Sequence, residues 1–285
     1  MTAYRDHFFH TTNGLRLYAR DYPGPKDPVG VVLCMHGLTR NSRDFQDLAV
    51  SLSRDFRVIV PEQRGRGRSD YDHDVSNYAV MQYVEDTRQL LKDLEVDQIS
   101  VVGTSMGGLM TFALNALYPG LVQRAIINDI GPEIAEAGLE RIKAYVGIAG
   151  PFRDWDEAVE YVKTVSGDIF PGWSDEQWAT FARQCYIERD GAVVIDYDPR
   201  IAEPLAADGT DNEQDVLWSL FEAMVGVPTL LIRGALTDLL SEECVQKMSE
   251  RHPDLHILEV PRVGHAPMLN EPGVPEAIHQ FLCAR

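Results

Sequence analysis

The segment Ile99-Ser100-Val101-Val102-Gly103-Thr104-Ser105-Met106-Gly107-Gly108 joins an apolar, β-branched run to a serine with glycines on both sides. A short continuous apolar run of this kind predicts a buried strand. From Leu109 onward, apolar residues recur at helical spacing, which predicts a helix. The pattern Gly103-x-Ser105-x-Gly107 between them therefore predicts a sharp strand-to-helix turn, where small flanking residues let the chain pass closely on both sides.

Such a turn holds the Ser105 hydroxyl at the carboxyl end of the sheet, where a substrate carbonyl can reach it. The N-terminus of the helix behind it favours developing negative charge. Ser105 is therefore the candidate nucleophile. The same five-residue pattern also occurs by chance in glycine-rich loops, and the alternative interpretation is a structural turn.

Strands and helices alternate on both sides of this segment. A hairpin is expected at residues 7–22, around Asn13-Gly14. Further strands are expected at 29–35, 57–60, 123–128, 227–233 and 255–260, and further helices after Asn41 or Ser42 and at 78–94, 241–251 and 275–282. The alternation predicts an α/β protein with a mostly parallel central sheet flanked by helices.

The alternation stops between residues 132 and 225. This segment contains helical stretches at 133–148, 155–166, 174–188 and 213–225, and a short β-like piece at 192–197. We expect it to be a mostly helical cap, or lid, inserted after strand 6 over the carboxyl edge of the sheet, where open α/β folds place their sites. Residues 1–131 and 226–285 then form the core domain.

A serine hydroxyl becomes a good nucleophile when a histidine accepts its proton and a carboxylate orients that histidine. In one known order of such triads, the acid and then the histidine follow the serine along the chain. His265, soon after the strand at 255–260, is the expected general base. Asp238, in the loop after the strand at 227–233, is the favoured acid, and Asp129, directly after the strand at 123–128, is its rival. All of them lie at carboxyl ends of expected strands, on the edge that carries Ser105.

A tetrahedral intermediate requires N–H donors that already point at its negative oxygen. The expected donors of this oxyanion hole are the backbone N–H groups of Met106, which follows the serine, and of Leu38, in the loop after the strand at 29–35. His36 in the same loop is expected to brace it through a hydrogen bond.

Four arginines, one after the strand at 29–35 and three in the loop 63–69, each have two possible interpretations. Arg40 either faces the pocket and binds a carboxylate or, as is more common, faces solvent. Arg64, Arg66 and Arg68 alternate with glycines in the loop 63–69 and resemble a phosphate cradle, but such alternation in an outer loop is more often structural.

Charge and sequence motifs bear on the expected partners, cofactors and location of the protein. The formal net charge of −18 argues against nucleic acids and anionic membrane surfaces, although a local arginine can still attract a small anionic substrate. The cysteines are scattered without metal-ligand spacing and no dinucleotide motif occurs, so no metal or other cofactor is expected. The N-terminus lacks the apolar core of a signal peptide, and no apolar run is long enough to span a membrane. We therefore expect a soluble, cytoplasmic protein that acts on a small-molecule acyl substrate.

The motifs occur in an order that resembles the α/β-hydrolase superfamily: His36-Gly37, Gly65-x-Gly67-x-Ser69, Gly103-x-Ser105-x-Gly107-Gly108, Asp238 and Gly264-His265. The resemblance covers about residues 7–283. It looks most like the capped branch, which includes esterases, enol-lactonases, carbon–carbon bond hydrolases and cofactor-free haloperoxidases. Haloalkane dehalogenases and most epoxide hydrolases of this fold have an aspartate nucleophile, so Ser105 argues against both.

Two positions depart from this pattern. Ala266-Pro267 follow His265, where carbon–carbon hydrolases of aromatic-ring breakdown usually have a tryptophan. Gln63 stands where relatives often have an aspartate, which affects the bracing of the loop more than the chemistry.

The expected function is hydrolysis of an ester, lactone or related acyl bond of a small molecule through Ser105, His265 and Asp238. Hydrolysis of a carbon–carbon bond, or haloperoxidase and perhydrolase chemistry with peroxide, would use the same residues. A small-ligand receptor that keeps the pocket is the non-enzymatic alternative. The aromatic residues of the expected cap line the pocket or form the core of the cap: Phe152, Trp155, Phe170, Trp173, Trp178 and Trp218.

Overall fold

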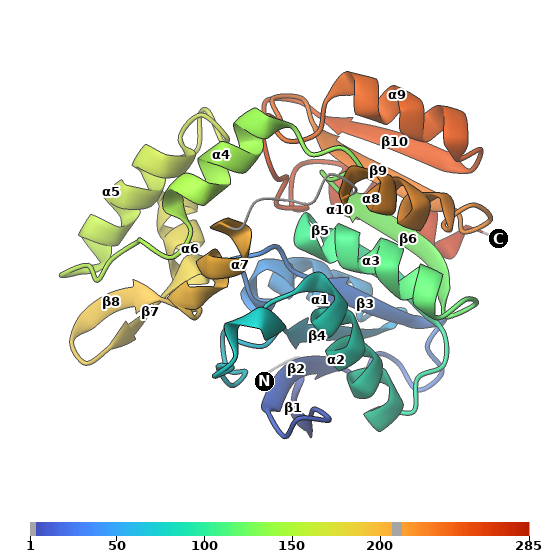
Figure 1. Ribbon diagram of the computed structural model, residues 1–285, viewed down its shortest axis with the longest axis horizontal. Coiled ribbons are helices and arrows are strands. Elements are labelled where there is room, and N and C mark those ends of the chain that lie inside the picture. The colour runs from blue at the N-terminus through green and yellow to red at the C-terminus, as the bar shows by residue number, and fades with distance from the viewer. Residues whose placement is uncertain (1–3, 207–212, 285) are drawn as a thin grey trace.

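The computed structural model describes residues 4–206 and 213–284, and its centre is an eight-stranded sheet with the order β1-β2-β4-β3-β5-β6-β9-β10 (Figure 1). β1 and β2 form an antiparallel hairpin, β2 runs antiparallel to β4, and all other neighbours are parallel. The expectation of a mostly parallel sheet is thus confirmed. Its strands are β1 (Arg5–His10), β2 (Arg16–Tyr22), β3 (Val31–Met35), β4 (Arg57–Glu62), β5 (Ile99–Thr104), β6 (Val122–Asn128), β9 (Thr229–Gly234) and β10 (Leu255–Val260).

Helices cover both faces of the sheet because alternate side chains of each central strand point to opposite sides. Leu33 and Met35 of β3 join the apolar cluster under α2, α3, α8 and α9, while Val32 and Cys34 join the cluster under α1 and α10. These helices are α1 (Gln46–Leu52), α2 (Val80–Asp93), α3 (Met106–Leu117), α8 (Glu213–Glu222), α9 (Glu242–Arg251) and α10 (Val274–Cys283). A 3-10 turn, η1 (Ser42–Phe45), precedes α1, and the side chain of Asn41 caps it.

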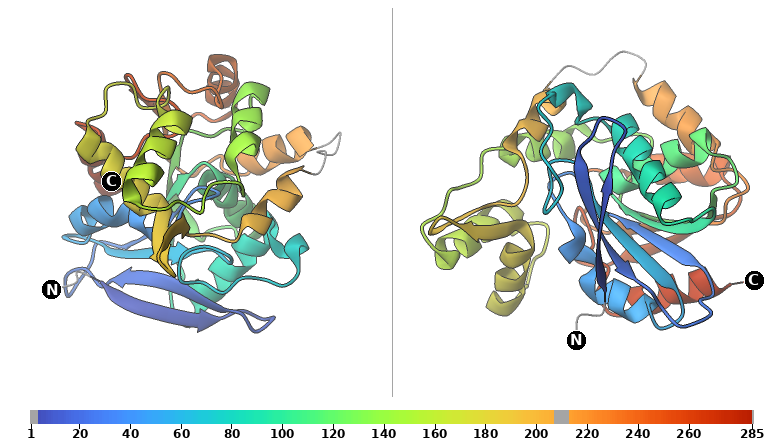
Figure 2. Two further views of the ribbon diagram at one scale, coloured as in Figure 1. Left: turned by 90° about the vertical axis from the view of Figure 1, so that its left-hand side faces the viewer. Right: turned by 90° about the horizontal axis from the view of Figure 1, so that it is seen from below.

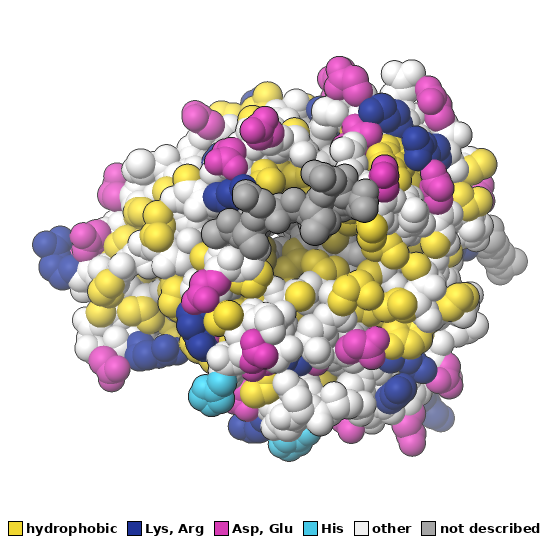
Figure 3. Space-filling model, viewed as in Figure 1, with side chains coloured by type: hydrophobic (Ala, Val, Ile, Leu, Met, Phe, Trp, Pro, Cys, Tyr) yellow, Lys and Arg dark blue, Asp and Glu magenta, His cyan; other side chains and the backbone are white. Residues whose placement is uncertain are grey.

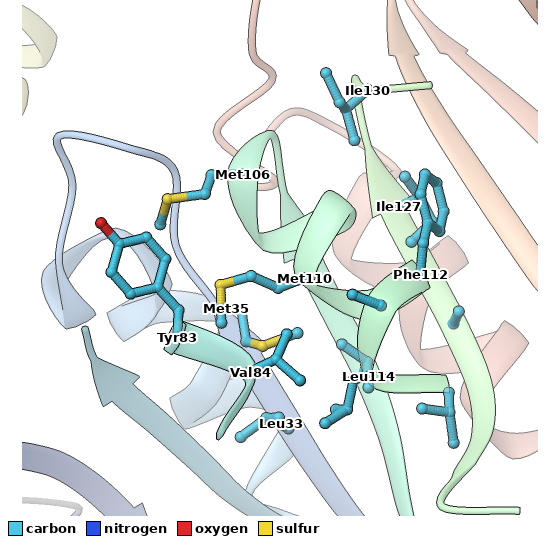
Figure 4. Packing of buried hydrophobic residues seen from close by; sticks show 14 of the residues in the cluster. Leu33, Met35, Tyr83, Val84, Met106, Met110, Phe112, Leu114, Ile127 and Ile130 are labelled. Atoms are coloured by element: carbon cyan, nitrogen blue, oxygen red, sulfur yellow. The ribbon is translucent and has the colours of Figure 1, made fainter. Parts of the chain in front are cut away.

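The α3 helix lies in the middle of this arrangement and carries the serine turn at its N-terminus. Figure 4 shows Met35, Val84 and Met110 among the side chains that fill the space between β3, α2 and α3. These side chains are almost completely withdrawn from water. Each buried side chain of this size contributes about 1.5–3 kcal/mol to folding, so the serine turn begins a helix that is held firmly against the sheet.

The cap stands to one side of the sheet, at the left of Figure 1 and of the right-hand view of Figure 2, and it faces the viewer in the left-hand view of Figure 2. It contains α4 (Glu136–Tyr145), α5 (Trp155–Ser166), α6 (Asp175–Cys185), the hairpin β7 (Tyr186–Arg189) and β8 (Ala192–Ile195), and α7 (Ala202–Ala206). Two further 3-10 turns are η2 (Val75–Asn77), before α2, and η3 (Pro199–Ile201), before α7.

The α8 helix lies within the segment expected to form the cap, but it packs on α3. Phe221 meets Phe112 edge to face, with ring centroids 5.4 Å apart, and the Asn115 side chain donates to the carbonyl of Ala223. The apolar face of α8 is therefore satisfied by the core, and the part of the chain that stands over the sheet edge ends before α8.

Among the described residues, no helix combines the length and apolar character needed to cross a bilayer. On the face drawn in Figure 3, acidic side chains are spread over both the cap and the core, and apolar side chains gather near the middle.

Candidate active site

Ser105 occupies the turn between β5 and α3 with φ 51° and ψ −115°, a conformation that costs a non-glycine residue free energy. Its flanking glycines make the turn possible. A Cβ atom at Gly103 would collide with the carbonyl oxygen of Gly107, and a Cβ atom at Gly107 would collide with the carbonyl oxygen of Met35. The backbone N–H of Ser105 donates to Asn128 of the neighbouring strand at 3.0 Å. The predicted turn is therefore present, and its strained geometry is held from both sides.

A chain of hydrogen bonds runs from Ser105 through His265 to Asp129. The Ser105 Oγ and His265 Nε2 atoms lie 2.9 Å apart, and His265 Nδ1 lies 2.9 Å from Asp129 Oδ2. The histidine chosen from the sequence is thus next to the serine, but the preferred acid is not its partner. Asp129, the rival, occupies that position, and the expectation for Asp238 is corrected here.

Asp129 is placed by its backbone and by three donors. It follows β6 with φ 58°, and its carboxylate is fully buried. Oδ1 accepts the Gly234 N–H at 2.8 Å, and Oδ2 accepts the Thr237 hydroxyl at 2.7 Å as well as the imidazole. A buried carboxylate needs such donors because an unpaired one would be expensive to desolvate. The loop after β9 therefore supplies hydrogen bonds to the carboxylate that contacts His265.

Asp238 has another partner, an arginine of the cap. Nε and Nη2 of Arg141 on α4 donate to its two carboxylate oxygens at 2.6 and 2.8 Å, a bidentate pair. This arginine lowers the pKa of Asp238, so the carboxylate stays ionised. The α4 backbone is tied to the same loop, since Gly138 and Ala135 donate to the carbonyls of Asp238 and Leu239 at 3.1 and 3.0 Å. Asp238 thus belongs to the junction between cap and core.

The two expected oxyanion donors come from different segments, the loop after β3 and the start of α3. Leu38 lies in the wall of the pocket beside Ser105, and Met106 opens α3. The backbone amides of Leu38 and Met106 donate to no other group in the part of the chain that the structure describes. Both are therefore available for a ligand oxygen.

Two buried side chains fix the orientation of that loop. His36 Nδ1 lies 2.7 Å from the carbonyl oxygen of Gly37, and this carbonyl belongs to the same peptide unit as the Leu38 N–H. Arg66 Nε donates to the carbonyl of Leu38 itself at 2.9 Å. Burial lowers the pKa of His36 to about 4, so its ring is neutral, and Nε2 accepts from the Gln63 N–H at 3.1 Å. The bracing role expected for His36 is thus present, whereas the contribution of Arg66 had no signal in the sequence.

The loop that carries His265 is braced from the core and from the cap. The Asn128 side chain donates to the carbonyl of Pro267 at 2.8 Å. On the other side, the Gly264 N–H donates at 2.7 Å to the carbonyl of Ile169, in the loop between α5 and α6. The cap therefore contacts the backbone directly next to the histidine.

A cavity of about 140 Å³ opens above Ser105 and His265, between core and cap. Its walls are mostly apolar and aromatic, with contributions from Tyr145, Tyr161, Val162, Phe170, Phe181, Tyr186 and Tyr197. Of the six aromatic residues considered from the sequence, Phe170 lines it. Trp173 and Trp178 pack with Phe170 and Phe181 in the cap, and Trp218 packs against Phe221 in the core. Two arginines, Arg40 and Arg141, also reach this cavity.

The other arginines of the glycine-rich loop are structural, as expected. Arg64 is fully buried between the carboxylates of Asp72 and Asp86. Arg68 is half exposed and pairs with Asp6 at 2.8 Å. Neither lies in the wall of the cavity above Ser105.

A family model described as alpha/beta hydrolase fold matches residues 30–272, most of the chain. The chain belongs to the alpha/beta hydrolase family. Within that family, it is 36% identical over 273 residues to a 3-hydroxybutyrate-oligomer hydrolase of Cupriavidus necator, a match that covers 93% of this chain and 92% of the relative. It is 27% identical over 239 residues to a 2-(acetamidomethylene)succinate hydrolase of Mesorhizobium japonicum, with 82% and 81% covered.

A solved structure agrees with these matches. The crystal structure of an alpha/beta hydrolase from Novosphingobium aromaticivorans superposes with a TM-score of 0.92 at 41% identity, covering 99% of both chains. The relatives are named hydrolases, and this alpha/beta hydrolase is a hydrolytic enzyme.

Proposed function

We propose that the enzyme is a serine esterase that cleaves short esters through Ser105, His265 and Asp129 and passes through an acyl-enzyme. The observation that carries the proposal is the hydrogen-bonded chain Ser105–His265–Asp129, in which both contacts measure 2.9 Å. That distance is within the range in which a general base accepts a proton from a nucleophile. The pocket directly above the serine supports the same conclusion.

In the first half of the reaction, Ser105 Oγ attacks the ester carbonyl while His265 Nε2 takes its proton. Asp129 accepts the hydrogen bond from Nδ1, which keeps Nε2 free as the acceptor and stabilises the imidazolium. The carbonyl oxygen becomes an oxyanion and is bound by the backbone N–H groups of Leu38 and Met106. The C–O bond then breaks, and His265 gives its proton to the departing alcohol.

In the second half, a water molecule takes the place of the alcohol. His265 removes its proton, the hydroxide adds to the acyl carbon, and the same two N–H groups bind the second oxyanion. Collapse of this intermediate breaks the bond to Ser105 Oγ, which recovers its proton from His265. The products are one alcohol and one carboxylic acid for each water consumed.

Small esters fit the cavity, whose volume of about 140 Å³ is below the roughly 300–1,000 Å³ of pockets that hold drug-sized molecules. Short oligoesters of hydroxy acids are the first class to test, because a relative 36% identical over 93% of the chain is named for 3-hydroxybutyrate oligomers. A cytoplasmic location is part of the proposal, and the four free thiols support it.

The test compares the wild-type enzyme with Ser105→Ala on p-nitrophenyl butyrate and on the 3-hydroxybutyrate dimer. We expect a burst of p-nitrophenol from the wild type and a loss of kcat of at least about 10³-fold in the variant. Mass spectrometry of the quenched wild type should find the acyl group on the peptide that contains Ser105. Turnover by Ser105→Ala at the wild-type rate would remove Ser105 as the nucleophile.

A further inference from the structure

Two guanidinium groups line the cavity, and they differ in how much of their hydrogen-bonding capacity is used. Each of the three guanidinium nitrogens of Arg40 has a partner. Its Nε and Nη2 atoms donate to Asp44 at 2.8 and 2.6 Å, Nη1 contacts the sulfur of Cys185, and the guanidinium carbon lies 4.4 Å from the centroid of the Phe181 ring. Asp44 also lines the cavity, so this pair presents no net charge to a ligand.

Arg141 is held differently. Asp238 engages Nε and Nη2, whereas Nη1 donates to no group of the described residues. Arg141 lines the cavity, whereas Asp238 is not among the residues that line it. About a quarter of the Arg141 side chain remains exposed. Asp238 thus holds one edge of a guanidinium that lies in the cavity wall, and Nη1 is left for a ligand.

The surroundings make this cation effective. The chain carries a formal net charge of −18, which disfavours an anionic substrate unless a local positive group attracts it. The cavity walls are otherwise mostly apolar, which strengthens a charge-assisted hydrogen bond inside them. A planar guanidinium with one edge free suits a carboxylate.

We propose that Arg141 binds a free carboxylate of the substrate and that Asp238 is its positioning residue. This inference rests on the proposed esterase function and narrows it to esters that carry a carboxylate group beside the scissile bond, such as oligoesters of hydroxy acids and half-esters of dicarboxylic acids. It also gives Asp238 a role in selecting the substrate in place of the role in the triad.

The test uses two acids and their methyl esters. 3-(Butyryloxy)butanoate carries its carboxylate on the alcohol side, and mono-p-nitrophenyl glutarate carries it on the acyl side. We expect the wild type to hydrolyse at least one acid with a higher kcat/KM than its methyl ester. Arg141→Met should lower this ratio of acid to methyl ester by about 10- to 100-fold, the range of one charge-assisted hydrogen bond.

Three further variants separate binding from structure. Lys143→Met removes an exposed cation from the same helix, where it pairs with Glu140, and should keep the wild-type ratio. Asp238→Asn keeps the arginine but loosens it, and should reduce the ratio less than Arg141→Met does. Arg141→Lys keeps the charge without the planar fork and should give an intermediate ratio, and it replaces Arg141→Met if that variant does not fold.

Binding provides a readout that does not depend on turnover. Glutarate and 3-hydroxybutyrate should bind to Ser105→Ala in calorimetry, and Arg141→Met in that background should weaken the tighter of the two. The proposal is overturned if the wild type prefers neither acid, or if the ratio survives both Arg141 substitutions. Failure of the esterase proposal is distinct, because then no ester, charged or neutral, is hydrolysed through Ser105.

Discussion

The carboxylate of Asp129 lies 2.9 Å from His265 Nδ1, although 136 residues separate the two along the chain. Asp129→Asn tests this relationship. Asparagine keeps the shape but presents a donor or a weaker acceptor to Nδ1, which favours the wrong imidazole tautomer. We expect kcat on p-nitrophenyl butyrate to fall by about 10³- to 10⁴-fold. Asp238→Asn should lower kcat on this neutral ester by less than about tenfold. An equal loss of kcat in the two variants would favour Asp238 as the acid.

Arg66 is fully buried, and its Nε donates to the carbonyl of Leu38. Arg66→Met should free the Leu38 loop and misalign one oxyanion donor. Removal of such a donor typically costs 10²- to 10³-fold in kcat, so we expect about a 10- to 100-fold loss in kcat with a smaller change in KM. A boronic acid that mimics the tetrahedral intermediate should lose affinity in parallel. Arg68→Met, in the half-exposed neighbour, is the matched control, and a similar loss there would contradict the assignment.

The lowered pKa of His36 predicts how the free energy of unfolding depends on pH. Burial lowers its pKa to about 4, from about 6.5 in the unfolded chain. Above pH 6.5 the ring is neutral in both states and contributes nothing to the pH dependence. As the pH falls from 6.5 to 4, the unfolded chain binds a proton on His36 but the folded protein does not, so the free energy of unfolding decreases. Below pH 4 both states are protonated, and the decrease is complete.

Urea denaturation at pH 7.5 and pH 4.5 measures this effect, with His36→Asn as the reference. Between these two values, the free energy of unfolding of the wild type should fall by about 2–3 kcal/mol more than that of the variant. The difference removes contributions from carboxylates, which both proteins share. Parallel losses in the two proteins would show that His36 is protonated in the folded state.

Gly107 has no room for a side chain, because a Cβ atom would collide with the backbone of Met35. Gly107→Ala must move β3 or α3, and overpacking of this kind costs about 1–3 kcal/mol. We expect a lower melting temperature and a larger loss of esterase activity, since the same movement displaces Ser105. Gly30→Ala is the matched control because nothing lies within 4 Å of its Cβ position. A Gly107→Ala variant with normal stability and activity would contradict the packing described for the turn.

Much of this fold could be predicted from the sequence because its signals are local. The apolar run at 99–102 and the glycines around Ser105 identify the turn from steric requirements alone, and His265 follows from its position after a strand. The choice between Asp129 and Asp238 depends on contacts between segments that are distant in the sequence. β6 and β9 are neighbours in the sheet, so both aspartates arrive at the same edge. The hydrogen bonds from Gly234 and Thr237, and the left-handed backbone at Asp129, decide between them.

Other parts of the site depend on contacts between distant segments. The ion pair between Arg141 and Asp238 could not be predicted from the sequence, because the two residues are 97 positions apart and belong to the cap and the core. Arg66 likewise stands in a loop whose alternation of arginine and glycine says nothing about which carbonyl each side chain reaches. The boundary between cap and core depends on such a contact as well, because an amphipathic helix at 213–222 could pack on either part, and its contact with α3 is not visible in the sequence.

The hydrogen bond from Gly264 to Ile169 has a consequence for protein engineering. Exchanging the lid between homologous enzymes is one way to alter substrate selectivity, but here a backbone carbonyl of the lid holds the residue directly before His265. A transplanted lid would need a carbonyl group at the same position. Without it, we expect the exchange to lower the catalytic rate as well as change the selectivity.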